Sequence, residues 1–198
     1  MMLSGDQDWK SLSPRDQELV IHAGVAIARR RGYAFRKDNW GKGLLGDPIR
    51  PLWVGFVVQR LWQPWLIERL PQYAVAIDLE PNDTGDQGRD LIVTRKGDAR
   101  RLLLSVKSSE VKDYNVVRLR IYLESGERDP LVDKCPFVLF GRSTRECTGG
   151  YMTGWKELER LLALPRVKAP AGHWNVELPK SELNPPATLI AAIKKWFA

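Results

Sequence analysis

The sequence predicts an α/β domain in which helices flank a central mixed β-sheet. Three observations lead to this prediction. A capped amphipathic helix opens at residue 14, short apolar segments with strand character follow between residues 74 and 141, and helical periodicity returns at residues 155–164 and 187–197. The 198 residues are enough for a single domain with one full-sized hydrophobic core.

Two helices are expected before the sheet. The first runs over residues 14–31, because Ser13 is a suitable N-cap, Pro14 fits the first helical position and Gly32 ends the pattern. The second covers residues 52–70, where Pro64 is expected to kink the helix or split it in two. Trp62 and Trp65 lie on this helix and are predicted to be packing residues.

The strand pattern follows the second helix. Segments with strand character cover residues 74–79, 90–94, 102–107 and 136–141, and residues 151–153 form a further short candidate. A polar turn at residues 81–88 and a tight hairpin at residues 96–99 separate the first three. The segment 102–107 is apolar enough to be central in the sheet. Residues 116–123 alternate between apolar and polar, as in a further strand or an edge strand.

Composition excludes several classes of protein. No apolar run is long enough to span a bilayer, so a membrane is not expected as a partner. The N-terminus lacks the pattern of a secretory signal, and two cysteines make neither a disulfide framework nor a zinc site. We therefore expect free thiols in a cytoplasmic protein. The net charge of +7 and the pI of about 9.5 favour a polyanionic partner such as DNA.

Residues 88–110 hold the informative pattern. Asp90 begins one predicted strand, a hairpin turns the chain back, and Lys107 ends the next strand, so the two side chains approach the same end of the sheet. Strand alternation places Ser105 on the same face as Lys107. A carboxylate that binds Mg²⁺ or Mn²⁺, beside an ammonium group that orients water and offsets phosphate charge, suits phosphodiester hydrolysis.

These residues resemble the core of the PD-(D/E)XK nuclease superfamily, in which an Asp begins one strand and an acid-x-Lys triplet ends the next. The resemblance covers residues 52–140, a nuclease-like core with an N-terminal helical segment 1–51 and a C-terminal segment 141–198 in one domain, 1–198. It implies a restriction-endonuclease-like fold and a metal-dependent DNA endonuclease. It also implies that Asp90 and Lys107 are catalytic.

The chain departs from the family pattern at two positions. Ser105 replaces the acid of the acid-x-Lys triplet, and Gln59 occupies the helical position that often carries Glu. Some members of the superfamily have Gln in place of the second acid and use a backbone carbonyl, which assigns Val106 as a metal ligand together with Asp90. Other carboxylates near in sequence, or on the first helix, are candidates to supply the missing charge: Asp78, Glu80, Asp83, Asp86, Glu110 and Glu18.

Nucleic-acid contacts are expected in two regions. Arg89 and Ser108 flank the signature, and Lys37, Lys42 and Arg50 form a basic arm in the loop between the first two helices. If no second carboxylate reaches Asp90, the alternative is an inactive nuclease-fold module that binds DNA, or a subunit of a larger nucleic-acid-processing assembly. A homodimer is a further option, and a protein-interaction domain unrelated to nucleic acid is the third hypothesis.

Overall fold

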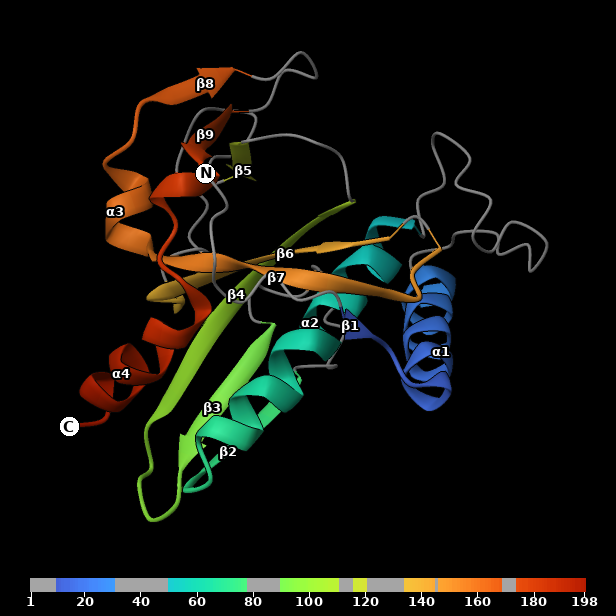
Figure 1. Cartoon of the computed structure of the whole chain (residues 1–198), viewed down its shortest axis with the longest axis horizontal. Helices are drawn as coiled ribbons and strands as arrows, with labels where there is room; N and C mark the ends of the chain where they lie inside the picture. The colour runs from blue at the N-terminus through green and yellow to red at the C-terminus, as the bar shows by residue number, and fades with distance from the viewer. Residues whose placement is uncertain are drawn as a thin grey trace.

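A six-stranded mixed sheet forms the centre of this computed structural model, which describes residues 10–30, 50–77, 90–110, 116–120, 134–144, 146–168 and 174–198 (Figure 1). Only the neighbouring strands β4 and β6 are parallel, and every other named pair in this sheet is antiparallel. In spatial order the strands are β1 (Lys10–Ser11), β7 (Gly149–Glu157), β6 (Phe137–Ser143), β4 (Arg101–Glu110), β3 (Leu91–Arg95) and β2 (Tyr73–Ile77).

Two long helices precede the sheet in sequence. In α1 (Pro14–Arg30) the Ser13 hydroxyl accepts a 3.1 Å hydrogen bond from the Asp16 backbone N–H, which confirms the predicted cap. The helix α2 (Arg50–Arg69) continues through Pro64, so it is not split there, and the kink that was the other expectation stays a prediction. Pro64 has no backbone N–H, so the Arg60 carbonyl one turn earlier lacks its helical donor. Because Pro64 is exposed, water can reach that carbonyl.

One face of the sheet packs against α2. Val57, Leu61 and Leu66 of the helix are buried in one cluster with Leu104 and Val106 of β4. The predicted packing role of the two helical tryptophans is confirmed, because Trp62 and Trp65 are both buried and their ring centroids lie 5.5 Å apart, edge to face. The C-terminal helix α4 (Pro186–Trp196) adds Leu189 and Ile193 to the same core.

A second, three-stranded sheet covers part of the other face. Its order is β5 (Val116–Arg120), β9 (Trp174–Pro179) and β8 (Arg166–Lys168), with α3 (Leu158–Leu162) and the 3₁₀ helix η3 (Lys180–Glu182) nearby in sequence. Val138 and Phe140 of β6 pack here against Leu119, Val176 and Leu178. Figure 1 shows this sheet at the end of the molecule away from the β3–β4 hairpin.

The predicted α/β architecture with a mixed sheet and flanking helices is confirmed. The helix expected at residues 155–164 is wrong at its start, because residues 155–157 belong to β7 and pair with β6. The strands β1, β8 and β9 were not predicted. Cys135 and Cys147 form no disulfide, as expected, and both side chains are buried. In the described segments, no helix is long and apolar enough to cross a membrane.

Candidate active site

Asp90 lies immediately before β3, is only 3% exposed and is the centre of a buried polar cluster. Its Oδ1 accepts a 2.8 Å hydrogen bond from Nε2 of Gln59. Its Oδ2 accepts one of 2.5 Å from the Val106 backbone N–H and one of 3.3 Å from the Ser105 hydroxyl. Three donors from α2 and β4 therefore converge on one carboxylate, as a buried carboxylate requires.

The end of the β3–β4 ladder explains how the carboxylate reaches β4. Leu91 is the Cα partner of Leu104 in the ladder. The backbone N–H of the preceding residue, Asp90, also bonds to the Leu104 carbonyl, at 3.0 Å, so two consecutive residues lie opposite Leu104. The regular register thus ends at Leu91. The Val106 N–H bonds to the Asp90 side chain, so the site lies where the described β3–β4 ladder ends.

Gln59 enters from the middle of α2 and is 7% exposed. Its Nε2 bonds to Asp90, but its Oε1 is buried and has no hydrogen-bond partner among the described residues. If Nε2 and Oε1 of Gln59 were exchanged, Oε1 would face the Asp90 carboxylate, and two acceptor oxygens cannot bond to each other. The Asp90 carboxylate therefore fixes the orientation of the Gln59 amide. An unsatisfied buried acceptor is costly, and this one needs a donor or a cation.

Lys107 is half-buried and, two residues beyond Ser105, projects from the same face of β4. It forms no hydrogen bond or ion pair with any described residue, so its ammonium group is available for another partner. Ser108 is half-buried on the opposite face of β4, where its hydroxyl lies 3.8 Å from the position of a Cβ added to Gly55 of α2. Its expected contact with nucleic acid remains a prediction.

Several predicted site residues lie outside the part that the structure describes. These are Arg89, Lys37, Lys42, Asp78, Glu80, Asp83 and Asp86. Arg50 is the first residue of α2 and Glu110 the last of β4, and neither side chain is described. Glu18 is exposed on α1. Within the described segments, no three His, Cys, Asp or Glu side chains gather to hold a metal ion.

The chain matches no protein-family model and no curated protein.

One charged residue near this face was not identified from the sequence. Arg142 of β6 is 2% exposed and pairs in register with Ser109, so its side chain shares the face of Lys107. The segment PFVLFGR suggests a strand that ends in an ordinary solvated Arg, because Arg is seldom fully buried. Only the pairing of β4 with β6 brings this second cation to the Lys107 face.

Proposed function

We propose that the chain is a divalent-metal-dependent DNA endonuclease of the PD-(D/E)XK type. One observation carries the proposal: Gln59 and Ser105, the residues at the two degenerate acid positions, both bond to Asp90. These three positions are separated by 31 and 15 residues in sequence and come from different elements. Their meeting at one carboxylate agrees with the arrangement that the signature implies.

The residues beside Asp90 fit a hard cation. Mg²⁺ prefers oxygen ligands, and the site offers the Asp90 carboxylate and the Ser105 hydroxyl. The resemblance adds the backbone carbonyl of Val106. Such an ion, when bound, would offset the charge of a phosphodiester and lower the pKa of a coordinated water. Mn²⁺ would serve the same role.

The protein's own groups have separate tasks in this proposal. Asp90 is held rigidly by its three donors, so its oxygens are oriented before a substrate arrives. Lys107, which has no ion-pair partner among the described residues, binds a non-bridging phosphate oxygen and orients the attacking water. The neutral Ser105 and Gln59 leave the site less negative than two further carboxylates would.

The test is cleavage of supercoiled plasmid DNA with Mg²⁺ or Mn²⁺, with EDTA as the blank. We expect cutting by the native protein and its loss in Asp90→Asn and Lys107→Ala. Matched controls are Glu159→Gln and Lys134→Ala, which change exposed charged side chains outside the site and outside residues 95–101 and 186–198. Cutting that survives Lys107→Ala, or that is absent from the native protein with both metals, would reject the proposal.

A specific observation favours a second candidate, the inactive nuclease-fold module that binds DNA or joins a larger assembly. Every donor to Asp90 given above is a neutral group, and the described residues include no second carboxylate in the cluster. This candidate predicts salt-sensitive DNA binding that EDTA leaves unchanged and that Asp90→Asn does not weaken. The same plasmid assay, run beside a binding assay, separates the two.

A further inference from the structure

A dense cluster of cationic side chains lies at one end of the sheet. The cluster comes from two segments: residues 95–101 around the β3–β4 hairpin, and residues 186–198, which include α4. Together they contain six cationic side chains and one acidic side chain, Asp98. Their side chains together have a net charge of +5. We call this cluster the basic end, and its cations are Arg95, Lys96, Arg100, Arg101, Lys194 and Lys195.

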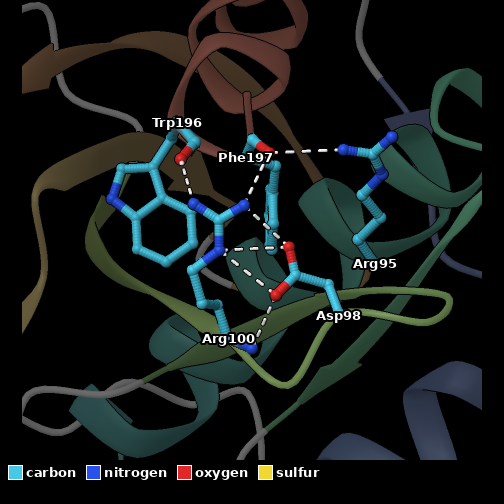
Figure 2. Close-up of polar contacts among 5 residues, drawn as sticks. All are labelled: Arg95, Asp98, Arg100, Trp196 and Phe197. Atoms are coloured by element: carbon cyan, nitrogen blue, oxygen red, sulfur yellow. Dashed lines mark hydrogen bonds and ion pairs between the residues drawn. The ribbon is translucent and has the colours of Figure 1, made fainter.

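Two of the six cations hold the basic end together (Figure 2). Arg95 and Arg100 both donate to the Phe197 carbonyl, at 3.2 Å and 2.6 Å, and Arg100 also donates to the Trp196 carbonyl at 3.5 Å. Arg100 forms an ion pair with Asp98 at 2.8 Å. These contacts fix the C-terminal end of α4 against the hairpin.

The other four cations have no such task. Lys96, Arg101, Lys194 and Lys195 are exposed and form no ion pair with a described residue. Four exposed cationic side chains in one region give it a positive electrostatic potential that attracts anions. The basic end is therefore suited to a polyanion, whose phosphates are regularly spaced along a backbone.

An open part of the sheet connects this end with the candidate active site. The second sheet covers the main sheet at β6, through Val138 and Phe140. On the same face of β2, β3 and β4, the side chains are exposed or half-buried. They are Ala74, Ala76, Ile92, Thr94, Arg101, Leu103 and Lys107. Arg101 and Lys107 share this face because six residues separate them.

We propose that this open face and the basic end together form a DNA-binding track, which leads from Lys107 along β4 to Arg101 and then round the hairpin to Lys194 and Lys195 on the α2 side of the sheet. The inference rests on the proposed function for its choice of partner, since Lys107 is taken to meet a phosphate. Six residues of strand span roughly 20 Å, which matches about six phosphate steps of a nucleic-acid strand at roughly 3.4 Å each. Beside this path, Ala74 and Ala76 of β2 are small and exposed, which leaves room for a nucleic-acid backbone near the sheet.

The experiment measures how DNA affinity depends on salt, using the full chain and a dye-labelled duplex of about 20 base pairs in the presence of EDTA. The track variant is Lys96→Ala/Arg101→Ala/Lys194→Ala/Lys195→Ala, which leaves the Arg95, Asp98 and Arg100 contacts in place. The control variant, Lys10→Ala/Arg15→Ala/Lys134→Ala/Arg160→Ala, removes four exposed cations outside the track. Circular dichroism and thermal melting verify that both fold.

We expect the slope of log affinity against log salt to fall by about 3 to 4 in the track variant, at about 0.9 per lost phosphate contact. The slope should change far less in the control variant. Equal losses in the two variants, no loss in the track variant, or no DNA binding by the native protein would overturn the proposal. So would a track variant that loses binding to vesicles of anionic phospholipid and keeps its affinity for DNA.

The two proposals fail separately. A native protein that binds DNA through the track but cuts no plasmid leaves the track in place and rejects the endonuclease. A protein that cuts plasmid DNA with unchanged salt dependence in the track variant keeps the endonuclease and rejects the track.

Discussion

Gln59 donates a 2.8 Å hydrogen bond to Asp90 and thereby joins the middle of α2 to the start of β3. The same amide leaves its own oxygen, Oε1, buried and without a hydrogen-bond partner among the described residues. A buried acceptor beside a buried carboxylate is unfavourable in an apolar core and useful in a site that receives a cation or a water molecule. This pair therefore gives the most direct tests of the candidate site.

The first prediction compares two substitutions of Asp90. Asp90→Asn keeps one oxygen for the Val106 N–H and the Ser105 hydroxyl, and its new amide can donate to Oε1 of Gln59 if the Gln59 amide turns over. We expect it to cost less than about 1.5 kcal/mol of stability. Asp90→Leu leaves the Gln59 and Val106 donors unsatisfied and should cost about 3 kcal/mol or more. Urea unfolding measures both, and equal losses would contradict the pairing.

The second prediction concerns Gln59→Glu, which places a carboxylate at the helical acid position. Two carboxylates at hydrogen-bond distance repel each other, so the variant should be less stable than the native protein without metal. Millimolar Mg²⁺ should then raise its melting temperature more than that of the native protein. The control is Gln63→Glu, one helical turn later, whose amide bonds to the Val75 carbonyl at 3.0 Å. Equal Mg²⁺ responses in the two variants would exclude a cation at Asp90.

The third prediction is a pH dependence at the basic end. The Arg100 guanidinium, bonded to the Asp98 side chain, and the Arg100 backbone N–H lower the pKa of Asp98 below its ordinary value of 3.8. A carboxyl whose pKa is lower in the folded state stabilises the fold above the unfolded pKa, and this contribution is lost as the pH falls through the folded value. At pH 6 we therefore expect the native protein to have a larger free energy of unfolding than the Asp98→Asn variant.

The size of this difference should shrink as the pH falls below 3.8, which urea unfolding across the pH range would measure. Because both side chains are solvent-accessible, added salt should also reduce it. A difference between native and Asp98→Asn that is independent of pH would show that the carboxylate charge is not what matters.

The fourth prediction uses two helical glycines. Replacing Gly by Ala in a helix usually adds about 0.5 to 1 kcal/mol of stability. At Gly55 of α2 the nearest atom to an added Cβ is the Ser108 hydroxyl at 3.8 Å, so Gly55→Ala should be stabilising or neutral. At Gly24 of α1 the added Cβ would overlap the Trp53 indole, which is buried in the core. Gly24→Ala should therefore lower the melting temperature, and a gain would contradict the α1–α2 packing.

Local chemistry in the sequence was sufficient for several elements. Ser13 caps α1 and a tight turn joins β3 to β4, with Gly97 at a φ of 80° that favours glycine. The apolar segment around Leu104 lies between β3 and β6, as its lack of alternation indicated. In each case the deciding interactions lie within a few residues of one another.

Other elements depended on partners far away in the sequence. The segment beginning at Trp155 has helical periodicity, yet Trp155 pairs with Leu139 in the sheet and its indole donates to Thr188 and to the Pro185 carbonyl. Pairing with β6 and contact with the start of α4 outweigh the weaker local preference for helix. The three-residue β8 has no strand signal of its own and exists because β9 lies beside it.

The sequence by itself determined the residue types of the candidate site and the hairpin that brings β3 beside β4. It did not determine that Gln59 and Ser105 would both bond to Asp90, because that contact requires α2 to pack on the sheet with one particular rotation. Nor did it show the basic end, whose cations come from residues 95–101 and 194–195. Tertiary structure decided both, since contacts between distant segments form only when a shared core fixes the elements that carry them.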